Sequence, residues 1–308
     1  MNLEQPKITN DLIESNKTAK LRTPEETLEE RKRRGERPVI LHKKDGEQEL
    51  VVIGLSHTLN LEKINRLKHL VREKHPDIFL RGVDIVIVEG TPVELNDNIS
   101  PEQIIKEYGE QTYFASLAKE QGLKVEYWDT GFEENFKNAT EKYDKDTVLT
   151  YFSSAILKIL LENRPQHINE FDVVNNGEIE KLKEILKRYI TAEMLNVVIK
   201  KTEDSNPIDE IDFENLFKKH CDKALADVTF GDIIKLSDPY EKGPTNEVIR
   251  YLNNSRDEKA MRVLEQSKQN HKSIFMTAGL DHVLAWEPVI DSLYKESISN
   301  DLDLNTLS

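Results

Sequence analysis

Two short apolar runs near opposite ends of the chain each stop at a glycine that is followed three residues later by a histidine. They read LVVIGLSH at 50–57 and SIFMTAGLDH at 273–282. Their length and β-branched content are typical of buried strands, and we expect each glycine to let the chain turn sharply off the strand end. Open α/β sheets usually bind ligands at the carboxyl edge of such strands. The pattern therefore predicts that His57 and His282 converge on one site.

Two further runs of strand character lie between these histidines, at 83–90 and 123–129, and they end in Glu89 and Asp129. The segments that separate the runs have helical periodicity, which is typical of strands joined by helical crossovers. A hairpin is expected just before the first histidine motif, around Asp45-Gly46. We therefore predict an α/β fold with a central mixed, mainly parallel sheet flanked by helices.

Domain organisation follows from where this pattern changes. Residues 1–37 hold few large apolar side chains, so they are predicted to be a charged, largely flexible segment. A capping box at Thr23 indicates a short exposed helix there, and its basic run at 31–34 is interpreted as a solvated face. Residues 38–308 are predicted to form a single α/β domain. Apolar positions at helical spacing across 131–235 predict a helical insertion in it.

Charge and cysteine content narrow the class of protein. The net charge of −14 argues against nucleic acid or an anionic membrane as the main partner. Cys221 is the only cysteine, which fits a reducing cytoplasm, and the N-terminus lacks the apolar core of a signal peptide. No run has the length needed to span a bilayer. We expect a cytoplasmic protein without membrane insertion.

The four strand ends carry groups that can bind a metal ion or move protons: His57, Glu89, Asp129 and His282. Imidazoles and carboxylates at one sheet edge suit a divalent transition metal such as Mn, Co or Zn. The same groups could instead act without a metal, with a histidine as general base and a carboxylate that orients it. The sequence has no Gly-x-Ser-x-Gly elbow, Walker-type loop or Gly-x-Gly-x-x-Gly turn.

A second capping box is predicted at residues 255–258, so we expect a helix to begin at Arg256. A cation in the first turn of a helix is disfavoured by the helix dipole, by about 0.3–1 kcal/mol. This cost suggests that Arg256 has another task, such as holding a substrate carboxylate or an oxyanion.

Several short motifs carry a resemblance to a known family. They are the hairpin into GLSH at 54–57, VEG at 88–90, GEQTYFASLA at 109–118, NSRDEKAM at 254–261 and GLDH at 279–282. In their order and spacing they resemble the TraB/PrgY/Tiki family, within a superfamily that includes erythromycin esterases and haem-binding ChaN proteins. The resemblance covers residues 38–135 and 240–290 and implies an EreA/ChaN-like fold.

The resemblance also implies roles for individual residues. His57, Glu89 and His282 would form the metal-binding or catalytic set, and Asp129 would stand where relatives tend to carry Glu. Arg256 would lead the Arg-Asp/Asn-x-x-Met motif, and Glu110 would be the acid at a helix start. Relatives with esterase-like chemistry have Glu directly after the first glycine, where this chain has Leu55, so hydrolysis of the erythromycin type is disfavoured.

Three functions are consistent with this pattern. The first is a metal-dependent hydrolase, with peptides as candidate substrates, in which Glu89, Glu110 and Arg256 serve catalysis. The second is a non-enzymatic protein that binds a peptide, a cofactor or another small-molecule ligand in the same pocket. The third is a toxin-like effector domain, which only the superfamily resemblance suggests.

Overall fold

The computed structural model describes most of the chain: residues 19–35, 37–56, 61–62, 64–65, 82–95, 99–163, 212–221, 223, 227 and 229–297. His57, one of the two histidines of the predicted site, lies outside these residues.

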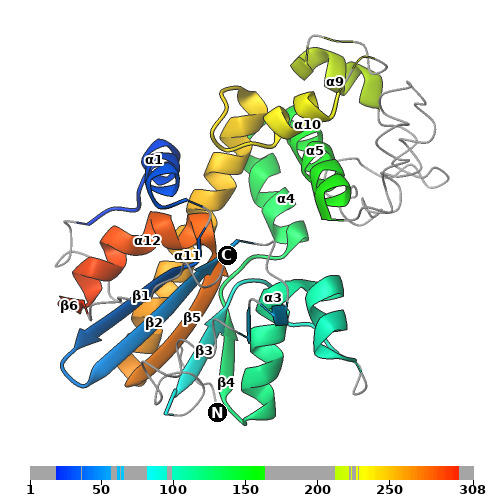
Figure 1. The fold of residues 1–308 in the computed structure, drawn as a ribbon. Helices are drawn as coiled ribbons and strands as arrows, with labels where there is room; N and C mark the ends of the chain where they lie inside the picture. The colour runs from blue at the N-terminus through cyan, green and yellow to red at the C-terminus, as the bar shows by residue number, and fades with distance from the viewer. Residues whose placement is uncertain are drawn as a thin grey trace, which may run out of the picture. The chain divides into compact units, whose positions relative to one another are not determined.

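The chain divides into two compact units. The first combines residues 1–129 with 257–308, and the second comprises residues 130–256. The elements of Figure 1 are α1 (Pro24–Arg34), β1 (Val39–Asp45), β2 (Gln48–Leu55), β3 (Ile85–Val88), α3 (Pro101–Glu120), β4 (Lys124–Tyr127), α4 (Phe132–Lys142), α5 (Lys145–Asn163), α9 (Phe213–Cys221), α10 (Phe230–Leu236), α11 (Pro244–Asn270), β5 (Ser273–Gly279), α12 (Leu280–Leu293) and β6 (Glu296–Ser297).

A six-stranded sheet in the order β4-β3-β5-β2-β1-β6 forms the centre of the first unit. Strands β2, β5, β3 and β4 run parallel to one another. β1 is antiparallel to β2 and to β6. The hairpin of β1 and β2 turns through Gly46, whose φ of 62° suits glycine. The prediction of a mixed, mainly parallel sheet flanked by helices is confirmed.

Helices cover both faces of this sheet (Figure 1). Along β3, Val86 and Val88 face a core with α3, whereas Ile85 and Ile87 face a core with α11 and α12. Alternation between two buried faces explains why this strand is apolar throughout. The first unit is therefore a three-layer arrangement in which α12 directly follows the last residue of β5.

Helix α3 is interrupted at Gly109, where φ is 86° and ψ is 168°. Only glycine adopts this conformation at little cost, so the helix stops and begins again at Glu110. Glu110, the predicted acid at a helix start, is buried in this second half. The helix begins after a capping box in which Ser100 is the N-cap residue and Gln103 is its partner.

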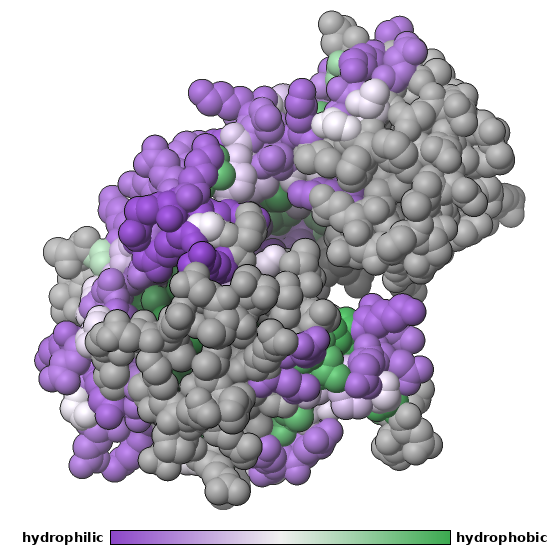
Figure 2. Space-filling view, viewed as in Figure 1, coloured by the Kyte–Doolittle hydropathy of each residue, from purple (hydrophilic) through white to green (hydrophobic). Residues whose placement is uncertain are grey.

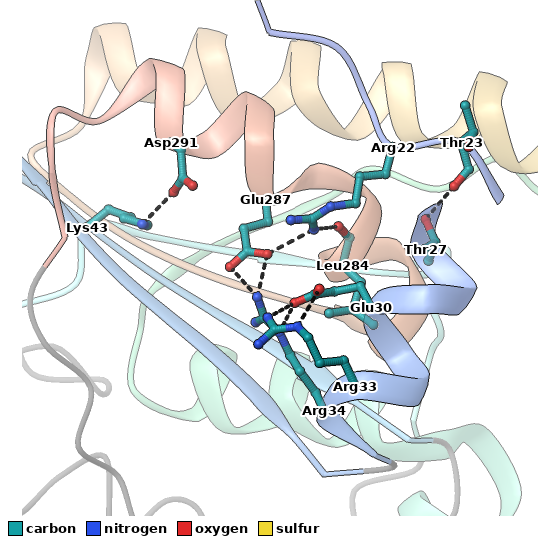
Figure 3. A network of polar contacts seen from close by, with 10 residues as sticks. All are labelled: Arg22, Thr23, Thr27, Glu30, Arg33, Arg34, Lys43, Leu284, Glu287 and Asp291. Carbon is teal, nitrogen blue, oxygen red and sulfur yellow. Dashed lines mark hydrogen bonds and ion pairs between the residues drawn. The ribbon is translucent and has the colours of Figure 1, made fainter. Parts of the chain in front are cut away.

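The N-terminal helix α1 begins at the predicted Thr23 capping box. It falls within the segment that was expected to be largely flexible, yet its basic run contacts acidic side chains of α12 (Figure 3). Arg31 pairs with Asp281 at 2.8 Å, and Arg34 pairs with Glu287 at 2.8 Å. The interpretation of this run as a solvated face is therefore wrong for Arg31 and Arg34, because their charges are matched by α12.

Pro288 inside α12 explains part of this contact. A proline has no N–H, so the main-chain carbonyl of Leu284 lacks its usual partner four residues on. The guanidinium of Arg22 donates a hydrogen bond to this carbonyl and a second one to Glu287, the latter at 2.9 Å. The main-chain N–H of Arg22 also donates to the carbonyl of Ala285 at 3.0 Å. The segment before α1 thus repairs a gap in the hydrogen bonding of α12.

The described part of the second unit contains the helices α4, α5, α9 and α10, the first half of α11, and no strand. Phe136 and Phe152 pack edge-to-face at 5.0 Å between ring centroids in its core. The ammonium nitrogen Nζ of Lys142 lies 4.0 Å from the centroid of the Tyr251 ring. The predicted insertion, residues 131–235, lies entirely within this unit.

One predicted boundary is wrong. Helix α11 runs without a break from Pro244 to Asn270, so no helix begins at Arg256. The residues at 255–258 match a capping box in composition only, since a cap requires the residue before the helix to leave the helical conformation. Arg256 is therefore an interior helical residue, and the dipole argument for its function no longer applies.

Arg22→Ala should lower the free energy of unfolding by about 1–3 kcal/mol, because it leaves the buried Leu284 carbonyl without a donor. Arg33→Ala is the matched control, because the Arg33 side chain is 67% exposed and pairs with Glu30 on its own helix. We expect its cost to be clearly smaller, because an exposed ion pair contributes little to stability. Urea unfolding measures both, and equal costs would contradict the role given to Arg22.

Glu30 should make stability depend on pH in acid. Its hydrogen bond from Arg33 lowers the pKa of Glu30 from the ordinary 4.5 to about 2. A depressed folded-state pKa contributes stability above pH 4.5 that is lost as pH falls toward 2. The stability difference between the wild type and Glu30→Gln should therefore shrink over this window in urea titrations. A difference that is constant with pH would contradict the assignment.

Candidate functional site

The two histidine motifs lie on adjacent parallel strands. β2 pairs with β5 so that Gly54 stands beside Ala278 and Leu55 beside Gly279. β3 lies on the other side of β5, and β4 lies beyond β3. The carboxyl ends of all four strands therefore meet at one edge of the sheet. The structure brings Glu89, Asp129 and the helix that carries His282 to this edge, as the sequence predicts.

Gly54 has a different role from the one predicted. It lies inside β2 rather than at a turn, and a Cβ built there would be 2.9 Å from Cβ of Val283 and 3.4 Å from Cα of Leu280. Glycine is required because the first turn of α12 packs directly against the backbone of β2. Gly279 does stand at a strand end, where it is the N-cap of α12. The motif thus sets how closely α12 approaches the sheet.

Glu89 follows β3 and reaches the start of α12. Its Oε2 accepts a hydrogen bond of 2.6 Å from the main-chain N–H of Gly279, and its own N–H donates to the carbonyl of Thr277 at 3.2 Å. The N-terminus of a helix favours a negative charge, so this position suits an ionised carboxylate. The Glu89 side chain is 10% exposed, and its second oxygen lies 3.7 Å from Nε2 of His282.

His282 lies in the first turn of α12, and its imidazole has a carboxylate on each side. Nδ1 is 2.6 Å from Oδ1 of Asp257, whereas Nε2 faces Glu89 at 3.7 Å. The first distance is a hydrogen bond and the second is too long for one. Nε2 and the Glu89 carboxylate therefore face each other without a direct hydrogen bond between them.

Two fully buried tryptophans, Trp128 and Trp286, lie beside His282 on the face of the sheet that α11 and α12 cover. The indole N–H of Trp286 donates to the same Asp257 oxygen at 2.6 Å. Trp128 packs edge-on against His282, at 5.5 Å between ring centroids, and against Trp286, at 5.2 Å. The imidazole is thus held in a fixed position by hydrogen bonding on one edge and aromatic packing beside it.

The other predicted site residues have different surroundings. The main-chain carbonyl of Asp129 accepts a hydrogen bond of 3.0 Å from Lys259. Glu110 belongs to α3, which covers the opposite face of the sheet from Asp257. Arg256 belongs to the second unit, and its charge partly offsets the burial that raises the pKa of Tyr151 to about 12. The metal-binding role of Asp129 and the catalytic roles of Glu110 and Arg256 remain predictions.

Asp257 is the site residue that the sequence analysis missed, because the helix start predicted at Arg256 would place it in an exposed first turn. Its spacing held a usable signal. Asp257 lies three, four and seven residues before Ala260, Met261 and Leu264, which are all buried in one core. A carboxylate in phase with the apolar face of a helix must be hydrogen-bonded when it is buried.

The fit of these groups to a metal ion can be judged from the donors present. Nε2 of His282 and the Glu89 carboxylate suit a divalent transition metal, and Asp257 supports the histidine as carboxylates commonly do behind metal ligands. Within the described residues, no three His, Cys, Asp or Glu side chains form a metal-binding group. A third protein ligand would have to come from residues outside the described ranges, and the ligand predicted there is His57.

Gly54→Ala should lower the free energy of unfolding by about 1–3 kcal/mol, because the new methyl group would overlap Val283. Its cost should be smaller in a Val283→Gly background, which removes both the Val283 Cβ at 2.9 Å and the Cγ2 at 3.1 Å from the new methyl group. Gly231→Ala is the control, since its nearest contact for a Cβ is an ordinary 3.7 Å. Thermal unfolding of the wild type, the three single variants and the double variant measures these costs. Equal costs of Gly54→Ala in both backgrounds would contradict the close approach of α12.

Comparison with known proteins leaves the resemblance as a prediction. No protein-family model matches the chain, and no curated protein matches it significantly in sequence.

Proposed function

We propose that this protein is a metal-dependent hydrolase whose active site lies at the carboxyl edge of β2, β5 and β3. One observation carries the proposal: Nε2 of His282 faces the Glu89 carboxylate at 3.7 Å while Nδ1 is held by Asp257. An imidazole supported by a buried carboxylate and set beside a second carboxylate is suited to hold a metal ion or to move a proton.

The donors that would hold the metal are His282 Nε2 and Glu89, with His57 as the predicted third ligand. A bound divalent ion would supply Lewis-acid activation of a water molecule and of the scissile carbonyl. Glu89 also accepts the N–H of Gly279, which holds its carboxylate beside His282. Peptides are the first substrates to test, because the Tiki-type resemblance implies them.

A metal-free hydrolase is the second candidate, and the Asp257–His282 hydrogen bond favours it. A histidine whose Nδ1 is bound to a buried carboxylate has the arrangement of a general base in acyl-transfer enzymes. In that case Nε2 would take a proton from water, and Glu89 would stabilise the imidazolium that forms. Chelators separate the two candidates, because only the metal-dependent enzyme loses activity when they are added.

The described surface bears on which ligands the protein can take. Most described residues on the face drawn in Figure 2 are hydrophilic, and Tyr108, 42% exposed, is the only large apolar side chain left exposed among the residues that the structure describes. In the described part of the chain, no helix is both long and apolar enough to cross a bilayer. The hydrophilic character of the described face agrees with a polar ligand such as a peptide.

Metal binding and turnover test the proposal together. Chelator-treated protein, free of any affinity tag, should bind Zn, Mn or Co in calorimetry and hydrolyse members of a peptide library. His282→Ala and Glu89→Gln should each weaken metal binding by more than about tenfold, since even a supporting residue behind a ligand contributes 10–100-fold. Turnover should fall in parallel.

His271→Ala is the matched control. His271 precedes β5 at the opposite edge of the sheet, so its loss should leave metal binding and turnover unchanged. Chelator-resistant hydrolysis that is lost in His282→Ala would select the metal-free candidate. Wild-type protein that neither binds metal nor hydrolyses any peptide would contradict the proposal and leave the non-enzymatic binding protein.

A further inference from the structure

Asp257 is a buried carboxylate, 7% exposed, that projects from α11 toward α12. Its Oδ1 receives two hydrogen bonds, each of 2.6 Å, from His282 Nδ1 and Trp286 Nε1. The two donors stand four residues apart on α12, so they lie on the same face of that helix. A single oxygen therefore joins the two helices directly behind the proposed site.

The direction of these hydrogen bonds follows from the donor groups. An indole nitrogen can only donate, so Asp257 Oδ1 must be the acceptor toward Trp286. The same oxygen contacts His282, where an ionised carboxylate can only accept. The proton between them therefore belongs to Nδ1 of the imidazole. In the neutral ring, Nε2 is then the nitrogen with the lone pair, and it is the nitrogen that faces Glu89.

Packing keeps the ring in this orientation. Trp128 meets the imidazole edge-on, with an interplanar angle of 75°, and it meets Trp286 at 81°. Both tryptophans are fully buried, so rotation of His282 would require a rearrangement of the core as well as loss of its hydrogen bond. The His282 side chain is itself only 12% exposed.

We propose that Asp257 is the positioning residue of this site: it fixes His282 as the Nδ1–H tautomer and directs the Nε2 lone pair toward a ligand beside Glu89. The identity of the ligand in this inference rests on the proposed function. The tautomer of the His282 ring does not. Asp257 acts through His282 and does not itself touch the ligand. Trp286 occupies the second hydrogen bond of the same oxygen and limits the rotation of the carboxylate.

The state of the imidazole can be measured without any activity. Long-range proton–nitrogen correlation spectra of protein with ¹⁵N-labelled histidine report which ring nitrogen carries the proton, and His282→Gln assigns the signal. Four chelator-treated proteins are compared at a pH where the same spectra show the His282 ring to be neutral. They are the wild type, Asp257→Ala, Asp257→Asn and Trp286→Phe. Zinc affinity is measured by calorimetry on the same samples.

We expect the Nδ1–H tautomer in the wild type. Asp257→Ala removes the acceptor, so it should raise the share of the Nε2–H tautomer. Asp257→Asn has the same size and keeps one acceptor oxygen but no charge, so it should hold the Nδ1–H tautomer less strongly than the wild type. Zinc affinity should fall by about 10–100-fold in both variants. Trp286→Phe retains the acceptor for His282 and should keep the wild-type tautomer, which separates positioning from general loosening of the core.

The inference is overturned if wild-type His282 carries its proton on Nε2, or if both Asp257 variants keep the Nδ1–H tautomer. These results are separable from failure of the proposed function. Wild-type protein that binds no zinc, yet shows the expected tautomer and its loss in the Asp257 variants, would refute the metal-dependent hydrolase and support the positioning role. If the alanine variant misfolds, Asp257→Asn still provides the test, because asparagine has nearly the same volume as aspartate.

Discussion

The parallel pairing of β2 with β5 is the constraint on which the proposed site depends. It places Gly54 beside Ala278, and the absence of a side chain at Gly54 lets α12 begin directly against the sheet. Because α12 begins directly after Gly279, the last residue of β5, His282 lies within one helical turn of the end of that strand. β3 lies on the other side of β5, so the Glu89 carboxylate accepts a hydrogen bond from the main-chain N–H of Gly279, between β5 and α12.

The site also places a charged side chain, Asp257, in the core of the first unit. Asp257 is buried among aromatic rings, and an unpaired carboxylate there would cost several kcal/mol. Two hydrogen bonds, from His282 and Trp286, compensate for that burial. The same bonds orient the imidazole toward Glu89. Stability and orientation therefore come from one set of contacts, which explains why a charged residue is compatible with this core.

The sheet was predictable because its signals are local. Apolar runs and the Asp45-Gly46 turn carry enough information to predict the strands, and the shared edge of parallel strands brings Glu89 and His282 together. The role of Asp257 was not predicted, because a capping-box composition at 255–258 resembles a helix start and only the preceding conformation distinguishes the two. The function of Gly54 was equally hidden, since the close approach of Val283 is a tertiary contact. Pairing of the basic run with α12 likewise depends on Asp281 and Glu287, which are distant in sequence.

A crystal structure of the protein grown with zinc, with anomalous diffraction recorded at the zinc edge, tests the central claim most directly. We predict an anomalous peak about 2.0–2.2 Å from both His282 Nε2 and a carboxylate oxygen of Glu89, with Nδ1 still bound to Asp257. Zinc bound only at surface residues, or bound to His282 through Nδ1 with Asp257 displaced, would contradict the account.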